Sequence, residues 1–347
     1  MMKKHSQGFS LVEVMVGLAI GMLGMIVVMQ VLSLTQASNR TTTSGADAQQ
    51  VGALALYSLE RDVRQAGFGF NVPGFLGCEL KGFDKNRGEA FDFTFTPVVI
   101  TQIGADEPDI VEINYGSSAK LAVPTNLTQS MSDTTSTYRV ANRFGFTVGD
   151  ILVGAESGKK CGISQVTGLP AAPDSNAIVH ASVASGRYNP AGGLSPAADY
   201  TYSTNGKLYN IGPNPVSNVY TVTDRGLEVL SNFTGEIQLV AEGVVDMQAD
   251  YGVDTNNDNA VDTYLTDPDT NGDGTITDVE WGKVLSIRLG IVARSRNREA
   301  GCDATTTLPS WVGGTFNAVE KDSDWQCYRY RVFETTSVLR NMVWRPL

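Results

Sequence analysis

The feature that most constrains this chain is an apolar run near its N-terminus, which covers residues 9–34. As an α-helix, this run would be roughly 39 Å long at about 1.5 Å per residue, which is enough to cross a bilayer. Lys3 and Lys4 precede the run, and no further lysine or arginine follows until Arg40. The positive-inside rule therefore predicts one membrane-spanning helix, with the N-terminus in the cytoplasm and the rest of the chain outside.

Two residues distinguish this run from an ordinary secretory signal. A secretory signal has a shorter apolar region, and its small-residue cleavage site follows that region. Here the small residue Gly8 precedes the run, and a lone acid, Glu13, lies inside it. Because an ionisable group at membrane depth is costly, Glu13 is a candidate functional residue.

The hexapeptide from Gly8 to Glu13 (GFSLVE) resembles the class III signal of type IV prepilins and type II secretion pseudopilins. The resemblance implies that residues 1–8 are a leader peptide, which a prepilin peptidase removes between Gly8 and Phe9. It also implies N-methylation of the new terminal Phe9, and pairing of Glu13 with the terminal amine of a neighbouring subunit in the filament. A buried carboxylate needs a cation, which is consistent with that pairing. A plain signal anchor with a stray glutamate is the alternative.

Helix-compatible residues continue beyond the apolar run, and the first proline is Pro73. Apolar residues between positions 48 and 63 recur at steps of three and four. We therefore expect one helix from about residue 9 to 66. Residues 9–34 would span the membrane and later lie in the core of the filament, and residues 35–66 would form an amphipathic continuation. Gly17 and Gly21 form a GxxxG step, which either permits close helix packing or lets the helix adapt when it leaves the membrane.

From residue 67 onward, short alternating or β-branched runs are bounded by Gly, Pro, Asn and Asp. Residues 67–347 are therefore predicted to form a large β-rich globular domain packed on the second half of the helix. The predicted fold class is α+β and pilin-like, with an antiparallel sheet region. The segment 185–206 is rich in Gly, Ser, Pro and Ala and is interpreted as an exposed loop.

Composition argues against several functions. The formal net charge of −11 disfavours a nucleic-acid-binding surface, which would need a basic stripe. Of the two histidines, His5 lies in the expected leader, so His180 alone remains for a catalytic triad or a zinc site. The sequence also lacks a nucleophile elbow and a phosphate-binding glycine loop. We therefore do not expect an enzyme.

The four cysteines are dispersed, and no two of them form a CxxC pair. An even number of cysteines beyond an export signal favours disulfides in an oxidising compartment, although buried free thiols are the alternative. Three pairings are possible. We favour Cys78–Cys161 and Cys302–Cys327, because each pair then closes a loop within one half of the chain.

An acidic region at residues 250–283 contains a candidate calcium loop that fits the pattern D-x-N-x-D-G-x5-E. Calcium prefers six to eight oxygen ligands, and short oxygen side chains at alternate positions can surround one hemisphere of the ion. Pro268 disfavours an entering helix, so we expect the loop among strands, with a short helix near Val279. The predicted ligands, including the Thr275 carbonyl and a water held by Thr277, come from Asp269, Asn271, Asp273, Thr275, Thr277 and Glu280.

The upstream run matches the same pattern in part, through Asp254, Asn256, Asp258 and Asp262. Its twelfth position is Leu265, which cannot bind a metal ion. The two runs could form one site each or share ligands, and the expected role of the calcium is structural. The alternative is that Asp, Asn and Gly are here because they favour turns.

Three stretches resemble PilW-type minor pilins, namely residues 251–264, residues 281–295 and the ending from Tyr328 to Trp344. The resemblance implies a minor subunit of a type IV pilus that helps to initiate assembly, in a tip complex with other minor pilins. It further implies contacts with the major pilin and with the inner-membrane assembly platform, and a contribution to pilus-dependent adhesion and twitching motility. The protein would reside in the inner membrane with its globular domain in the periplasm, and later in a pilus on the cell surface.

Two alternatives share this architecture. One is a minor pseudopilin of a type II secretion system, and the other is a calcium-dependent adhesin at the tip of the pilus.

Overall fold

A computed structural model describes residues 8, 10–70, 74–118, 124–299 and 301–343. Helix α1 (Leu11–Gln65) follows an extended Ser10 and is about 80 Å long at about 1.5 Å per residue. It ends where Gly67 adopts a positive φ of 83°, which a residue with a side chain rarely adopts. Phe9, where the helix was expected to begin, lies outside the described residues.

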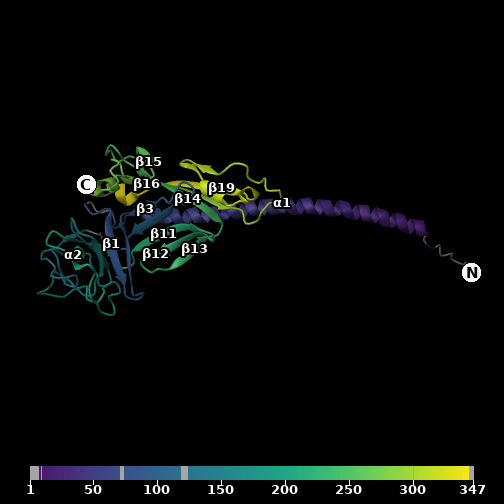
Figure 1. Ribbon diagram of the computed structural model, residues 1–347. Helices are drawn as coiled ribbons and strands as arrows, with labels where there is room; N and C mark the ends of the chain where they lie inside the picture. The colour runs from purple at the N-terminus through teal and green to yellow at the C-terminus, as the bar shows by residue number, and fades with distance from the viewer. Residues whose placement is uncertain (1–7, 9, 71–73, 119–123, 300, 344–347) are drawn as a thin grey trace, which may run out of the picture.

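The two halves of α1 have different surroundings. The stretch Leu11–Ser33 has a mean hydropathy of 2.5, none of it is buried, and it is long and apolar enough to cross a membrane. In the second half, Ala55, Leu59 and Val63 are fully buried against the sheets. Gly52 contacts the ring of Phe333, where an added Cβ would lie 2.1 Å from a ring carbon. Figure 1 shows the first half extending away from the rest of the molecule.

Two antiparallel sheets pack with the second half of α1 around one hydrophobic core, and we call this unit the body. The five-stranded sheet has the order β13-β12-β11-β4-β3, and the four-stranded sheet has the order β15-β14-β16-β19. The strands of the first sheet are β3 (Val98–Thr101), β4 (Ile110–Tyr115), β11 (Val216–Thr223), β12 (Gly226–Ser231) and β13 (Ile237–Ala241). Those of the second are β14 (Val244–Val253), β15 (Thr263–Leu265), β16 (Val284–Arg294) and β19 (Tyr330–Val338).

A six-stranded sheet forms a second unit, which we call the distal lobe, at the end of the molecule farthest from the N-terminus (Figure 1). Its order is β2-β1-β8-β7-β10-β5, and β1 and β8 are parallel. The chain enters the lobe twice, through residues 78–95 and 124–212. Its strands are β1 (Cys78–Asp84), β2 (Glu89–Phe95), β5 (Thr125–Asn126), β7 (Ile151–Ala155), β8 (Cys161–Gln165) and β10 (Lys207–Gly212).

Shorter elements complete the described chain. Two small sheets pair β6 (Tyr138–Arg139) with β9 (Ala177–Ile178) and β17 (Ser310–Trp311) with β18 (Gly314–Thr315). The short helices are α2 (Ala197–Tyr200), α3 (Asp278–Gly282), α4 (Arg340–Val343), η1 (Asn317–Lys321) and η2 (Trp325–Cys327). The structure pairs Cys78 with Cys161 and Cys302 with Cys327, which are the two pairs that the sequence favoured.

The predicted fold class is confirmed: a long N-terminal helix packs on antiparallel sheets in a pilin-like α+β arrangement. The interpretation of residues 185–206 as an exposed loop is wrong in part. Tyr188, Tyr200 and Tyr202 are buried, and the rings of Tyr188 and Tyr202 pack into the cores of the distal lobe.

Candidate functional site

The N-terminal segment is exposed where the structure describes it. Gly8 is exposed, whereas Phe9 and residues 1–7 lie outside the described residues. Glu13 lies in the first turn of α1 and is also exposed. The apolar surface around it is therefore available to lipid or to other helices.

A buried carboxylate, Asp62, anchors α1 to the five-stranded sheet. Its Oδ2 accepts hydrogen bonds from the Tyr220 hydroxyl at 2.7 Å and from Asn218 Nδ2 at 2.8 Å. The Tyr115 hydroxyl and the Arg61 guanidinium donate to Oδ1. Burial and then the Asp62 charge raise the pKa of Tyr220, which therefore stays protonated and donates. Asp62 was not among the residues predicted from the sequence, although an acid within an apolar helical stripe is a signal for such a role.

The second acidic loop, residues 269–280, follows β15, ends in the first turn of α3 and is held by its own side chains. The Asp269 carboxylate accepts the N–H groups of Gly272 (2.7 Å) and Gly274 (2.8 Å), both of which have positive φ. Asn271 Oδ1 accepts the N–H of Asp273 at 2.8 Å, and Asp273 Oδ1 accepts the N–H of Thr275 at 2.8 Å. The glycines are thus required by the turn that the carboxylates stabilise.

Glu280, in the first turn of α3, closes this loop. Its Oε1 accepts the N–H and hydroxyl of Thr270 at 3.0 and 3.1 Å, and its Oε2 accepts the N–H and hydroxyl of Thr277 at 2.9 Å each. Thr277 and Glu280 thereby form a capping box for α3. The hydrogen bonds from Thr277, followed by those from Thr270, lower the pKa of Glu280 to about 2. Thr277, predicted to hold a water ligand, here caps a helix.

The first acidic loop, residues 254–262 between β14 and β15, repeats these contacts position by position. The Asp254 carboxylate accepts the N–H groups of Asn257 (2.6 Å) and Asn259 (2.8 Å), which have φ values of 65° and 64°. Asn256 and Asp258 each accept the N–H of the residue two positions later, at 2.8 Å. The two runs therefore share one backbone conformation.

Asp262 closes the first loop as Glu280 closes the second. Its Oδ2 accepts the N–H and hydroxyl of Thr255, both at 2.8 Å. The hydroxyl bond and then the N–H bond lower the pKa of Asp262. Matching the run to a twelve-residue template placed Leu265 at the closing position, but Leu265 pairs with Tyr251 in the sheet. The equivalent acid comes three residues earlier, a shift that local spacing alone does not reveal.

The donor set of both loops consists of carboxylate, amide and hydroxyl oxygens, which are the hard ligands that calcium prefers. Within the described part of the chain, no three His, Cys, Asp or Glu side chains are grouped so that they could hold a metal ion. Glu280 would have to exchange hydrogen bonds for the ion in order to bind it with both oxygens. Calcium binding by either loop stays a prediction.

Helix α3 ties the second loop to the chain segment that leads into the distal lobe. The Asp278 carboxylate accepts the N–H of Gly74 at 2.9 Å and the N–H of Leu76 at 2.7 Å. Trp281 covers Gly77, where an added Cβ would lie 2.5 Å from the indole ring. The acidic loops therefore lie beside the junction of the body and the distal lobe.

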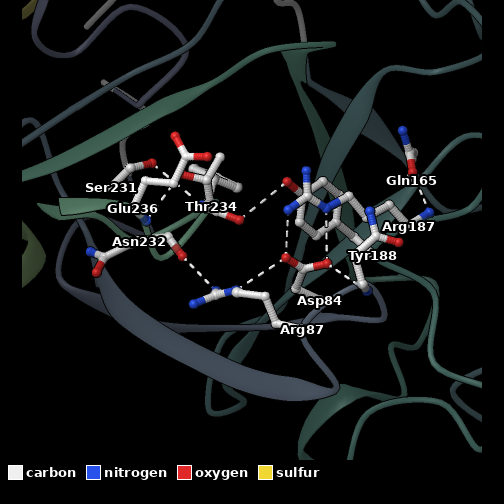
Figure 2. A network of polar contacts seen from close by, with 11 residues as sticks. Asp84, Arg87, Gln165, Arg187, Tyr188, Ser231, Asn232, Thr234 and Glu236 are labelled. Atoms are coloured by element: carbon white, nitrogen blue, oxygen red, sulfur yellow. Dashed lines mark hydrogen bonds and ion pairs between the residues drawn. The ribbon is translucent and has the colours of Figure 1, made fainter. Parts of the chain in front are cut away.

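A second polar junction joins the distal lobe to the β12–β13 turn of the body (Figure 2). Buried Asp84 accepts two hydrogen bonds from Arg187, at 2.8 and 2.6 Å, and one from Arg87 at 3.1 Å. Arg87 also donates to the backbone carbonyl of Asn232 at 2.9 Å. Burial by itself would raise the pKa of Asp84, but the bonds from Arg187, the Asn86 N–H and Arg87 outweigh it and lower the pKa to about 2. The carboxylate therefore stays ionised and holds both arginines.

Two family models match the chain. The family described as Type IV Pilus-assembly protein W matches residues 209–341, and the Prokaryotic N-terminal methylation motif matches residues 3–29. The first match begins in β10 and ends in α4, so it covers most strands of the body. The second covers the apolar half of α1 as far as residue 29, and most of the distal lobe lies between the two matches. No curated protein and no solved structure matches the chain.

Proposed function

The chain belongs to the PilW family of type IV pilus-assembly proteins and carries the N-terminal methylation motif of prepilins, and we propose that it is a minor pilin that helps to initiate pilus assembly in a tip complex with other minor pilins. Its role in this proposal is structural and not enzymatic. Before assembly it spans the inner membrane once, with the N-terminus in the cytoplasm. After processing by prepilin peptidase and transfer through the assembly platform, it joins the major pilin in the filament.

The position of the distal lobe is the observation that supports a place at the tip. The lobe lies at the end of the molecule opposite to the apolar half of α1 (Figure 1). If the helices of a filament run parallel to its axis, with their apolar halves toward the base, the lobe projects toward the tip. A neighbouring subunit on the tip side would clash with the distal lobe, whereas the first subunit of a filament has no neighbour on that side. The geometry therefore favours initiation over repeated use in the shaft.

Deletion of the gene tests the assembly role. We expect surface pili to disappear while the major pilin still accumulates in the membrane, and the wild-type chain to restore them. Glu13→Gln should fail to restore pili, because Glu13 is the acid that the prepilin resemblance assigns to subunit pairing. Glu60→Gln is the matched control, since Glu60 lies on the same helix and forms an ion pair with Arg64 of that helix. Normal piliation in the deletion strain would refute the proposal.

The same strains separate the two alternatives. A type II secretion pseudopilin would leave pili intact and retain secreted enzymes in the periplasm. A tip adhesin would leave pilus number unchanged in a chelator while attachment falls.

We also propose that each acidic loop binds one calcium ion that stabilises the junction beside the distal lobe. Two features support this: the oxygen-only donor set and the repeated conformation of the two loops. Calcium at about 100 times its dissociation constant would stabilise the folded chain by about 2.7 kcal/mol per site.

Native mass spectrometry and thermal unfolding of the full chain in detergent, with and without calcium, test this second proposal. Asp269→Asn and Asp254→Asn should each remove one bound ion. Asp224→Asn, an exposed acid in the turn between β11 and β12, should remove none. An unchanged ion count in both loop variants, or no calcium in the wild type, would rule the sites out.

A further inference from the structure

Two buried carboxyl groups, those of Asp109 and Asp246, lie near enough to interact electrostatically where the chain passes from the loop 102–109 into the body. Asp109 directly precedes β4, and Asp246 lies near the start of β14. The Asp109 N–H donates to the Met247 carbonyl at 2.8 Å, and Asp109 Oδ2 accepts the Ala249 N–H at 2.8 Å. These two bonds place Asp109 along β14 beside Met247 and Ala249, where the charge of Asp246 acts on it.

Both side chains are removed from water, since Asp109 is 2% exposed and Asp246 is 0% exposed. Asp246 Oδ1 accepts a hydrogen bond from Gln248 Nε2 at 3.0 Å. Among the described residues, Asp246 Oδ2 has no hydrogen-bond partner. The N–H groups of Met247 and Ala318 favour the charged carboxylate, but burial outweighs them. A buried carboxylate oxygen without a donor is strongly disfavoured, and the usual remedy is a proton.

The charged groups around the pair do not neutralise it. Glu107, in the same loop, and Asp250, on β14, add negative charge. The nearby cations are already paired: Lys321 of η1 with Glu107, and Arg288 of β16 with Asp250 at 2.6 Å. The remaining acid of η1, Glu320, is exposed.

We propose that Asp109 and Asp246 form a buried carboxyl pair that holds a proton in the folded protein and loosens the loop 102–109 when that proton is lost at higher pH. Asp246 lies on β14, which is paired with β16, whereas Asp109 is the last residue of the loop 102–109 and lies outside the paired strands. This loop also carries the bonds to the segment closed by Cys302–Cys327, through Asn317 to the Ala105 carbonyl and through Lys321 to Glu107. Repulsion between two ionised carboxylates would therefore act on the contact between this loop and that segment.

The direction of the pH effect follows from the two groups. Burial is the main cause that raises the pKa of Asp109 to about 7 and that of Asp246 to about 6, from an ordinary value of 3.8. A carboxyl with a raised pKa stabilises the fold fully below its ordinary pKa, and this contribution is lost as the pH rises through the folded value. The fold should therefore lose stability between about pH 4 and pH 7. A shift of two pKa units corresponds to about a 100-fold change in the unfolding equilibrium constant.

The test is urea unfolding of the full chain in detergent at pH 5 and pH 8. Asp246→Asn keeps an acceptor for Gln248 but cannot ionise. We expect it to reduce the pH 8 to pH 5 ratio of unfolding constants at least tenfold relative to the wild type. Asp106→Asn, an exposed acid of the same loop, is the matched control and should leave the ratio unchanged. Asp109→Asn, which keeps an acceptor for Ala249, is the second variant and should behave like Asp246→Asn.

Infrared spectroscopy provides a readout that a purely packing role would not change. At pH 5 the wild type should show the carbonyl band of a protonated carboxyl, and Asp246→Asn or Asp109→Asn should weaken it. Equal pH dependence in the wild type and both variants would overturn the proposal. Stabilisation of the wild type, but not of Asp246→Asn, by calcium or potassium chloride at pH 8 would also overturn it, because the pair would then bind a cation.

Discussion

Replacing Asp84 with asparagine removes the charge at the centre of the junction in Figure 2 without changing the size of the side chain. The pKa of Asp84 is about 2 in the folded chain and ordinarily 3.8. This difference of almost two units corresponds to about 2 kcal/mol of folding free energy at pH 7. Arg187 and Arg87 retain 32% and 24% side-chain exposure, so water can solvate them in the variant. We therefore expect Asp84→Asn to destabilise the fold by about 2–3 kcal/mol and no more.

Urea unfolding of the full chain in detergent, followed by two probes, measures this loss. The described tryptophans, Trp281, Trp311 and Trp325, all lie outside the distal lobe, so their fluorescence reports on the body. Circular dichroism reports on the strands of both units. If the junction couples the units, Asp84→Asn should shift the circular dichroism transition to lower urea than the fluorescence transition.

The pH dependence supplies a second check with a defined sign. A carboxylate with a lowered pKa stabilises the fold above its ordinary pKa, and this contribution is lost as the pH falls through the folded value. The difference between wild type and Asp84→Asn should therefore persist above about pH 5 and shrink toward pH 2. Asp174→Asn is the control, because Asp174 pairs with Arg139 at 2.7 Å but is 54% exposed. Equal effects of the two substitutions, or a difference that is the same at pH 2 and pH 7, would refute the reasoning.

Three further changes test the packing of the body and the lobe. Asp62→Leu should destabilise the chain by about 3–5 kcal/mol in urea unfolding, because it leaves the buried hydrogen-bond donors that anchor α1 without an acceptor. A loss below about 1 kcal/mol would contradict the anchoring role. Gly52→Val should lower the melting temperature measured by circular dichroism, since an added Cβ would lie 2.1 Å from the ring of Phe333, whereas Gly45→Ala, in open space on the same helix, should not. Removing the Cys78–Cys161 bridge by substituting serine for both cysteines should destabilise the chain by about 2–5 kcal/mol in urea unfolding, because the bridge closes a separation of 83 residues; equal stability of wild type and variant would exclude a stabilising role.

Local features of the sequence were enough to predict the long helix, its division into two halves and the β-rich region. The helix depends on the apolar run over 9–34, on the periodic apolar residues after it and on the absence of proline before Pro73. Each of these is a property of neighbouring residues, so it can be recognised without knowing what the chain packs against. The acidic loops were located for the same reason, since their turns are stabilised by side chains within a few residues.

Other parts of the candidate site depend on residues that are far apart in the sequence. Asp62 is held by Asn218 and Tyr220, which lie more than 150 positions later. Asp278 holds the backbone of Gly74, at a separation of 204 residues. Spacing along the chain carries no information about such pairs, because they form only after the strands between them have been placed.

The membrane-length helix, the prepilin-type start and the large β-rich region could all be predicted from the amino-acid sequence. Those properties follow from hydrophobicity, backbone propensity and short motifs, which act over a few turns or strands. The division of the strands into a body and a distal lobe is seen only once the chain is folded, as are the positions of Asp84 at one junction, Asp278 at the other, and Asp109 near Asp246. The physical reason is that burial and the pairing of polar groups depend on the packing of distant segments, and burial is what gives these carboxyl groups their individual roles.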